Sequence, residues 1–366
     1  MKLVVFGLTI SSSWGNGHAT LWRGLCHALA AQGHQVTFFE KDVSYYAGAR
    51  DYWEIPGGRL VLYADWRDVQ LLAQRELESA DAAIVTSYCP DALIWKDLVL
   101  ESPALHVFYD LDTPVTLGRL MRGEEVPYIG PGGLGDFDLV LSFTGGRALE
   151  ILRDELGARR VAPLYGHADP DVHGRVPLNA TYRSHLSYLG TYAADRQRAL
   201  EMLFVEPARA RPHLRFVIAG AQYPQDFPWS DNIYFVRHLP PAEHAAFFSS
   251  SRLTLNITRQ DMAAMGWCPS GRLFEAALCG TPVLTDEWQG LDAFFEPESE
   301  IITAATAEDS IAALDRSDVE LAGIAKRARE RVLAEHTSMH RARELVSLLD
   351  GHTTARPKQF VSEARM

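Results

Sequence analysis

One segment combines a carboxylate with the turn chemistry that would hold it at the edge of a cleft. Residues 270–286 read SGRLFEAALCGTPVLTD, and the acid within them is Glu275. The sequence predicts a helix of small apolar residues that ends at Gly280, because glycine adopts a left-handed backbone there at little cost. A short buried strand follows from Pro282. Glu275, expected at the start of that helix, is either a ligand-binding carboxylate or an incidental acid of an ordinary helix–strand unit.

A second candidate is the loop that follows the first apolar run of the chain. It reads SSSWGNGH from Ser11 to His18. Gly15 and Gly17 let the backbone approach a ligand closely, and the start of the next helix offers unpaired N–H groups to an oxygen or a phosphate. The pattern is not the full dinucleotide fingerprint. His18 can shuttle a proton near neutral pH, or it is a helix-capping or core histidine.

Two acids follow a later apolar run. Asp110 and Asp112 stand two residues apart, just before Thr113 and a proline. They can bind a divalent metal, orient an acceptor hydroxyl, or cap the next helix. Asp112 or Thr113 suits the cap, because proline is favoured in the first helical turn. For Asp110 we predict a catalytic or acceptor contact.

Three arginines in the second half of the chain suit a phosphate, because a guanidinium is a planar fork that matches phosphate oxygens. Arg196 lies just inside a predicted helix, and Arg259 lies just after a predicted strand. Each of these two is alternatively a surface ion-pair partner. Arg272 precedes Glu275 by three residues on the same helix face, where it can pair with that acid or reach phosphate.

The elements that would position these residues alternate between strand and helix. Short apolar runs, without polar alternation, predict strands of a parallel sheet that is covered on both faces. In the first half these runs are residues 2–8, 35–40, 59–63, 82–86, 105–109 and 139–143. In the second half they are residues 214–219, 233–236, 253–256 and 283–285. In such sheets ligands bind outside the carboxyl ends of the strands.

The chain divides into two such series. Its 366 residues are long for one hydrophobic core and suit two. Residues 163–177 carry prolines and glycines and predict an interdomain linker. We therefore expect an α/β protein with two tandem, Rossmann-like, doubly wound domains facing a cleft, over residues 1–165 and 178–335. Residues 336–366 would form a C-terminal helix and a tail, which is polar and expected to fray from residue 352.

Composition and charge limit the partners. The formal net charge is −12, whereas a protein that grips nucleic acid needs a basic face, so we expect no nucleic acid as a partner. The four cysteines show no metal-ligand spacing and fit reduced thiols. We therefore expect no metal site and a cytoplasmic location. No apolar run approaches the roughly 20 residues that span a bilayer, and the apolar start lacks a signal-peptide cleavage site.

Several ordered strings resemble one family. They are FYDLDTPVT from Phe108, LSFTGG from Leu141, LSYLGTYAADRQ from Leu186, VIAGAQYP from Val217, TLNITRQDM from Thr254 and RLFEAALCGTPVLTDEWQGLD from Arg272. In order and spacing the chain is similar to the CgeB-like glycosyltransferases, first named from a spore-maturation protein. The similarity is close over residues 100–305 and loose elsewhere. It implies the GT-B fold and a nucleotide-sugar-dependent glycosyltransferase of the hexosyltransferase type.

The resemblance also implies roles for particular residues. Glu275 would hold the ribose hydroxyls of a nucleotide sugar, which serves as co-substrate in place of a cofactor and of which a UDP-sugar is one example. His18 would be a general base or a donor-sugar contact, and Arg259 would bind phosphate. Basic side chains and helix dipoles would neutralise the diphosphate without a metal. The helical residues 321–349 would pack back on the N-terminal domain.

One departure from the family pattern concerns Trp267. Retaining families of this fold place a second glutamate eight residues before the ribose-binding one, and here that position is Trp267. Three points stay open. They are the residue that contacts the donor sugar, the retaining or inverting outcome of the reaction, and the acceptor, which is a glycan, a small molecule or a protein. Two alternatives remain: a nucleotide-sugar epimerase of the same fold, and a non-catalytic nucleotide-sugar-binding protein.

Overall fold

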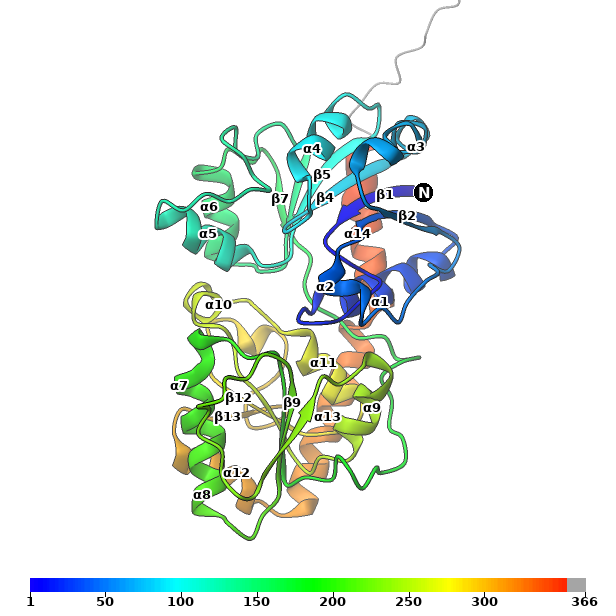
Figure 1. Ribbon diagram of the computed structural model, residues 1–366. Coiled ribbons are helices and arrows are strands. Elements are labelled where there is room, and N and C mark those ends of the chain that lie inside the picture. Colours follow the sequence, from blue (N-terminus) through cyan, green and yellow to red (C-terminus); the bar gives the residue numbers. More distant parts are fainter. Residues whose placement is uncertain (354–366) are drawn as a thin grey trace, which may run out of the picture.

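Two parallel sheets organise residues 1–353, the part of the chain that the computed structural model describes (Figure 1). The strands of the N-terminal sheet are β1 (Lys2–Gly7), β2 (Gln35–Lys41), β3 (Arg59–Tyr63), β4 (Ala82–Thr86), β5 (Leu105–Asp110), β6 (Leu139–Ser142) and β7 (Val161–Pro163). Those of the C-terminal sheet are β8 (Leu186–Leu189), β9 (Phe216–Gly220), β10 (Ile233–Arg237), β11 (Thr254–Asn256), β12 (Val283–Thr285) and β13 (Ile302–Thr303). The expected tail lies outside the described residues from residue 354 onward.

The sheet orders are β3-β2-β1-β4-β5-β6-β7 and β10-β9-β8-β11-β12-β13. In each sheet the order reverses beside the first strand of the domain, which creates the switch point typical of doubly wound sheets. The predicted fold class, two tandem doubly wound α/β domains, is confirmed.

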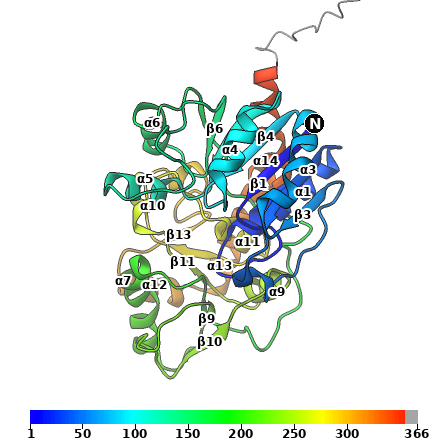
Figure 2. The same cartoon turned by 45° about the horizontal axis from the view of Figure 1, so that its top comes forward.

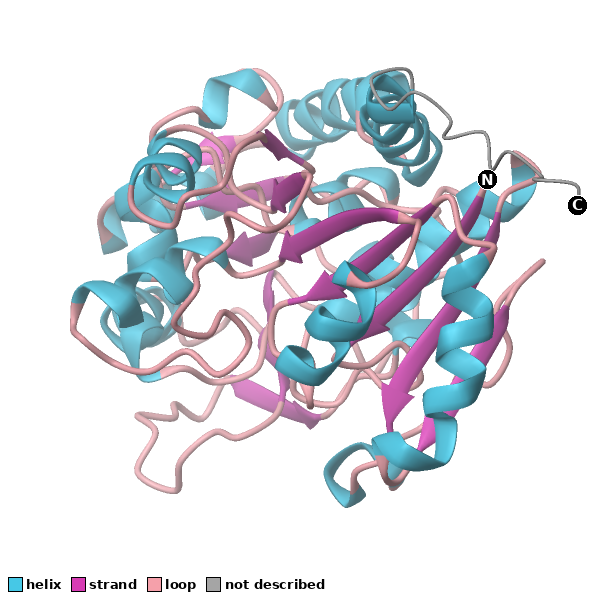
Figure 3. Cartoon of the chain, turned by 90° about the horizontal axis from the view of Figure 1, so that it is seen from above, coloured by secondary structure: helices cyan, strands magenta, loops and turns pink. Residues whose placement is uncertain are grey.

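Helices cover both faces of each sheet, as Figure 3 shows for the strands in magenta between helices in cyan. The helices of the N-terminal series are α1 (His18–Ala31), α2 (Ser44–Ala47), α3 (Trp66–Glu78), α4 (Ala92–Leu100), α5 (Thr113–Met121) and α6 (Arg147–Asp154). Those that follow are α7 (Gln197–Leu200), α8 (Glu206–Ala210), α9 (Pro241–Ser249), α10 (Gln260–Met265), α11 (Gly271–Leu278), α12 (Ala307–Asp315), α13 (Asp318–Glu335) and α14 (Ser338–Thr353).

The strands are continuous apolar runs because neighbouring side chains point to opposite faces and both faces are buried. In β1, Leu3 and Val5 pack in one cluster with α1 and α14. Val4 and Phe6 pack in another cluster with α3, α4 and α6. Phe6 stacks on Trp95 of α4, with ring centroids 4.6 Å apart. One strand therefore contributes to two hydrophobic layers at once.

The last helix belongs to the first domain. α14 contacts α1 and β5, and its Leu345 is buried in the same cluster as Leu25 of α1. α13 instead buries Ala328 and Val332 in the cluster that contains α11. The prediction that all of residues 321–349 return to the N-terminal domain is therefore wrong for α13 and holds for α14 alone.

The chain crosses between the domains twice, and the two crossings lie side by side. The first follows β7, within the predicted linker, and the second follows α13. The Ala168 N–H donates to the His336 carbonyl at 3.3 Å, and the Ser338 N–H donates to the Ala168 carbonyl at 2.9 Å. A movement of one domain against the other must therefore involve both crossings.

The domains also touch at both rims of the cleft between them. At one rim α10 contacts α5 (Figures 1 and 2). At the other, the Gln222 amide donates to the Tyr45 hydroxyl at 2.7 Å. Close to that contact, the Trp14 ring lies edge-on to His238, with centroids 4.8 Å apart. Trp14 thus packs across the domain boundary.

The predicted helix that begins near Arg196 is irregular. It consists of a 3-10 turn η1 (Ala194–Arg196), the single turn of α7, and a π-helical segment η2 (Glu201–Val205) that leads into α8. Pro207 has no N–H to donate to a carbonyl in the preceding turn, and its ring crowds that turn. A wider π turn just before the proline accommodates it. Strands β7, β8 and β13 are not among the strands that apolar runs predicted.

Trp267 is wedged between glycines of both domains. A Cβ on Gly146, which follows β6, would come within 2.5 Å of the indole, and a Cβ on Gly290 would come within 2.6 Å. The Trp267 N–H donates to the Gln289 carbonyl at 2.7 Å, and its own carbonyl accepts from Gly145 at 3.0 Å. The residue at the position of the missing glutamate therefore packs the two domains together.

We expect Gly146→Ala to lower the free energy of unfolding by at least about 2 kcal/mol. Gly146 has φ +57 and ψ −136, and a strained backbone and an overpacked contact each cost about 1–3 kcal/mol. The control is Gly48→Ala, because Gly48 has φ −72 and nothing within 4 Å of its Cβ position. Urea unfolding of both variants measures this loss of stability. Equal unfolding midpoints would contradict the close packing of Trp267 against Gly146.

Candidate active site

A cleft of about 500 Å³ separates the carboxyl ends of the two sheets. Loops after β1 and β5 line it on one side, and loops after β8, β9 and β11 line it on the other, together with α11. This is where doubly wound sheets bind their ligands. Seven of the eight predicted site residues line it: Gly15, Gly17, His18, Arg196, Arg259, Arg272 and Glu275.

The eighth residue, Asp110, lies beneath the cleft. It is the last residue of β5 and is fully buried. One carboxylate oxygen accepts from the Asp112 N–H at 3.0 Å, and the other has no hydrogen-bond partner among the described residues. The predicted contact between Asp110 and an acceptor does not fit this position. The side chain at the strand end points into the protein, and the acid two residues later reaches the cleft.

That second acid, Asp112, pairs with His18. The Nε2 atom of His18 lies 3.2 Å from a carboxylate oxygen of Asp112. His18 begins α1, and Asp112 occupies the N-cap position of α5 without a capping hydrogen bond from its side chain. The Asp112 side chain is 22% exposed and that of His18 only 10%. The pair therefore turns its carboxylate toward the cleft, where it can hold a hydroxyl group.

The glycine-rich loop between β1 and α1 is shaped by close contacts. Gly15 has φ +67, and a Cβ there would come within 2.6 Å of the Tyr45 hydroxyl. Gly17 has open space at its Cβ position. The helix cap comes from Asn16, whose side-chain oxygen accepts from the N–H groups of His18 and Ala19 at 3.1 and 3.2 Å. His18 is therefore capped by its neighbour and keeps its ring for Asp112.

Glu40, at the end of β2, anchors the start of this loop. Its fully buried carboxylate accepts from the N–H groups of Ile10 and Ser11 at 2.7 and 2.9 Å. It also accepts from the hydroxyls of Thr9 and Ser11 at 3.0 and 2.5 Å. Four donors offset the cost of burying the charge. Sequence reasoning missed Glu40, because its partners are about 30 residues away.

On the C-terminal wall, two of the arginines donate to backbone carbonyls at the end of β8 and in the loop that follows it. Arg272 donates to the Leu189 carbonyl at 2.6 Å and to the Ser270 hydroxyl at 3.1 Å. Arg196 is mostly buried and donates to the Thr191 carbonyl at 2.5 Å. In the described part of the chain no ion pair joins either guanidinium to an acid, so the predicted alternative of a surface ion pair for Arg196 is wrong.

Arg259 is the third cationic side chain of this wall. It precedes α10 and forms an ion pair with Asp195 at 3.1 Å. Burial lowers its pKa, but Asp195 and Asp112 outweigh that effect and raise it. The guanidinium therefore stays charged at the edge of the cleft that faces the His18–Asp112 pair.

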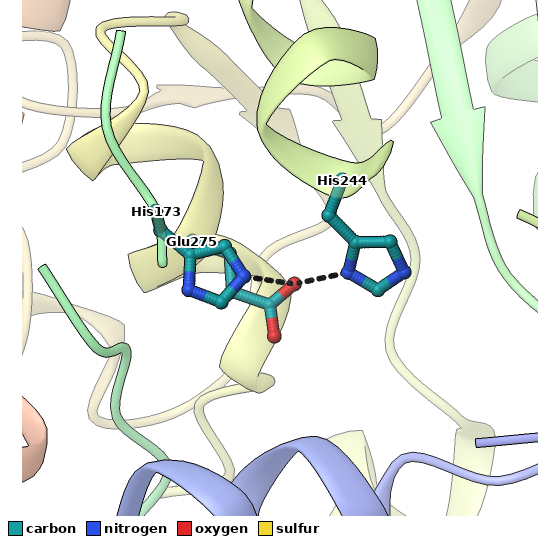
Figure 4. A group of neighbouring side chains, drawn as sticks. All are labelled: His173, His244 and Glu275. Atoms are coloured by element: carbon teal, nitrogen blue, oxygen red, sulfur yellow. Dashed lines mark ion pairs between the residues drawn. The ribbon is translucent and has the colours of Figure 1, made fainter. Parts of the chain in front are cut away.

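Glu275 lies in the second turn of α11, and not at its start as predicted. One carboxylate oxygen lies 3.5 Å from Nδ1 of His244 and 4.0 Å from Nε2 of His173 (Figure 4). The other oxygen points away from both rings in Figure 4. Burial raises the pKa of Glu275, but the two histidines and Arg272 outweigh it and hold that pKa below its usual range.

The two histidines are functional candidates that sequence reasoning missed. His173 stands in the linker and His244 in α9, so neither shares a local motif with Glu275. His244 lines the cleft with Glu275, whereas His173 lies behind them. Only the packing of α9 and the linker against α11 brings the three together.

Asp110 predicts a pH effect on stability. Burial raises its pKa to about 6, well above the value of about 3.9 that is usual for an aspartate. The native state therefore holds this proton longer than the unfolded state does, and stability from Asp110 is lost as pH rises through 6. We expect Asp110→Asn to leave the free energy of unfolding nearly unchanged at pH 4 and to raise it by about 3 kcal/mol at pH 7.

Urea unfolding of wild type and Asp110→Asn at pH 4, 5, 6 and 7 measures that difference. A difference that is the same at every pH would mean that Asp110 keeps an ordinary pKa in the folded protein.

Comparisons with known proteins agree with this architecture. Residues 196–347 match a model of the family described as glycosyl transferase-like. A search of curated protein sequences finds no significant match. A sucrose-phosphate synthase from Thermosynechococcus elongatus has a similar structure, with 14% identity and a TM-score of 0.71 over 97% of this chain and 100% of that one.

Two further solved structures are similar. One is an alpha-glucosyltransferase in complex with UDP and a 13-mer DNA, at 13% identity and TM-score 0.68 over 96% of this chain and 99% of that one. The other is Anabaena HepE in complex with UDP and glucose, at 14% identity and TM-score 0.67 over 95% of this chain and 99% of that one. Because the alpha-glucosyltransferase is in complex with DNA, its similar fold does not support the expectation that this protein has no nucleic-acid partner.

Within residues 1–353 no helix has the length and apolar character that a membrane span requires. The CgeB-like subtype stays a prediction, because the matching family is described only as glycosyl transferase-like. The chain has the GT-B fold of these glycosyltransferase structures, and residues 196–347 match the glycosyl transferase-like family.

Proposed function

We propose that this protein transfers a hexose from a nucleoside-diphosphate sugar to an acceptor hydroxyl. The observation that carries the proposal is one cleft with a buried carboxylate and three guanidinium groups on its C-terminal wall, opposite the His18–Asp112 pair. Two of the similar structures contain UDP, one with glucose. A UDP-hexose is therefore the first donor to test.

In this proposal the donor lies on the C-terminal wall. The free oxygen of Glu275 accepts from the ribose hydroxyls, and the charges of Arg196, Arg259 and Arg272 meet the diphosphate. The N-terminus of α11, which lines the cleft at Ser270, adds N–H groups of favourable polarity. These cations and dipoles neutralise the leaving group without Mg²⁺ or Mn²⁺ at the diphosphate.

The acceptor lies on the N-terminal wall. Its hydroxyl oxygen forms a bond to the anomeric carbon while the bond from that carbon to the diphosphate oxygen breaks. The proton of the hydroxyl passes to the His18–Asp112 pair. Proton transfer to a positioned side chain contributes about 10²–10⁴-fold to the rate. The arginines stabilise the charge that develops on the diphosphate. Asp112 replaces Asp110 in the role predicted from sequence.

A donor panel tests the function. The protein is incubated with UDP-, GDP-, ADP- and dTDP-hexoses, and the products are identified by mass spectrometry. We expect slow hydrolysis of one donor, which acceptors accelerate, and no gain in rate when Mg²⁺ or Mn²⁺ is added after chelator. Interconversion of two donors would indicate an epimerase, binding without turnover would indicate a binding protein, and rescue by Mg²⁺ or Mn²⁺ would refute the cation-free diphosphate site.

We expect Arg259→Ala to weaken UDP binding by about 10–100-fold, which is the scale of a lost hydrogen bond to a charged group. Uridine binding should change less than about threefold, because uridine has no phosphate. The matched control is Arg211→Ala, since Arg211 also pairs with an acid, Asp315 at 2.7 Å, away from the cleft. Calorimetry measures both ligands, and equal weakening of UDP and uridine would contradict a phosphate contact.

A further inference from the structure

Three buried side chains from separate elements converge behind the cleft. They are His173 of the linker, His244 of α9 and Glu275 of α11 (Figure 4). A carboxylate oxygen of Glu275 lies 3.5 Å from Nδ1 of His244 and 4.0 Å from Nε2 of His173. One ligand atom from each residue lies within 4.8 Å of the other two.

These side chains lack the partners that burial demands. Each is at most 9% exposed. Within the described residues no hydrogen bond of standard geometry reaches either ring nitrogen of His173, Nδ1 of His244 or the shared oxygen of Glu275, and the contacts among these atoms are ion pairs at 3.5 and 4.0 Å. Buried polar groups are normally hydrogen-bonded, and an orphaned cluster calls for a bound water or ion. The 3.5 Å contact between Nδ1 of His244 and Glu275 is close to a hydrogen bond, whereas Nε2 of His173, at 4.0 Å, is beyond hydrogen-bond distance of that oxygen.

The spacing of the three atoms suits a small divalent cation. Zinc binds histidine nitrogen and carboxylate oxygen at about 2.0–2.2 Å in tetrahedral geometry, which separates neighbouring ligand atoms by about 3.3 Å. The observed separations of 3.5 and 4.0 Å need only small side-chain rotations to reach that value. Two histidines and one glutamate form a known zinc ligand set, with a fourth position left open.

We propose that His173, His244 and Glu275 bind one zinc-class divalent cation through Nε2, Nδ1 and a carboxylate oxygen. Because His244 and Glu275 line the cleft, the cation has an entry path from it. The cation ties the linker to α9 and α11. It is separate from the diphosphate region at Arg259, and the inference does not depend on the proposed transfer reaction.

A second group of potential ligands provides a control. His27, Asp169 and Asp171 also lie close enough together to hold an ion. His27 is already hydrogen-bonded to Asp169 at 2.7 Å, and Asp171 is exposed. This group has a partner for its histidine and access to water, so nothing in it calls for a cation.

The test uses the full chain without a histidine tag, stripped with EDTA and dialysed. Calorimetry with Zn²⁺ should give one site per chain. His173→Gln and His244→Gln should each weaken that site at least about 100-fold, because loss of a direct ligand exceeds the 10–100-fold typical of residues behind the ligands. His27→Gln should bind as wild type does. Co²⁺ should give the strong visible absorption of a four-coordinate site in wild type and His27→Gln only.

Three outcomes would overturn the proposal. Wild-type protein that binds no Zn²⁺ below about 100 μM has no such site, whatever the variants do. Equal binding by all variants means that zinc binds elsewhere. Loss of binding in His27→Gln alone assigns zinc to the second group. Circular dichroism checks that each variant is folded. If a histidine variant does not fold, Glu275→Gln takes its place, because glutamine preserves the shape of the side chain.

Discussion

The buried negative charge of Glu275 is the constraint on which the cleft depends. A carboxylate removed from water is costly unless charged or polar groups surround it, and those groups here come from the linker, from α9 and from α11 itself. Their positions fix how the linker leaves the N-terminal domain and how α9 packs on α11. The carboxylate keeps one oxygen for a ligand because the histidines approach the other.

The N-terminal wall of the cleft also contains a buried carboxylate that polar groups stabilise. Glu40 is buried at the end of β2 and holds four donors of the loop that leads to His18. The loop is therefore rigid before any ligand arrives, which lowers the entropic cost of binding. Asn16 then caps α1 and leaves the imidazole of His18 to meet Asp112. Both walls thus rest on a buried acid, of which only Glu275 stands out in the local sequence.

The relative position of the walls depends on contacts far from the chemistry. Two chain crossings pair through Ala168, α14 returns to cover the first sheet, and Trp267 fills the space between Gly146 and Gly290. Trp267 stands where other families of this fold carry a second glutamate. Its indole is used for packing, so in the proposed function other residues of the cleft would contact the sugar of the donor.

The amino-acid sequence was enough to predict the two doubly wound sheets, the glycine turn after α11 and eight site residues, of which seven line the cleft. These features follow from local rules, because apolar runs report burial on both faces and loops after parallel strands meet at one edge. Only the tertiary structure decided that Asp112 and not Asp110 faces the cleft, that α13 and α14 belong to different domains, and that His173 and His244 reach Glu275. The direction of a side chain at a strand end depends on the packing around it, and contacts between residues distant in sequence exist only once the helices and the linker have packed.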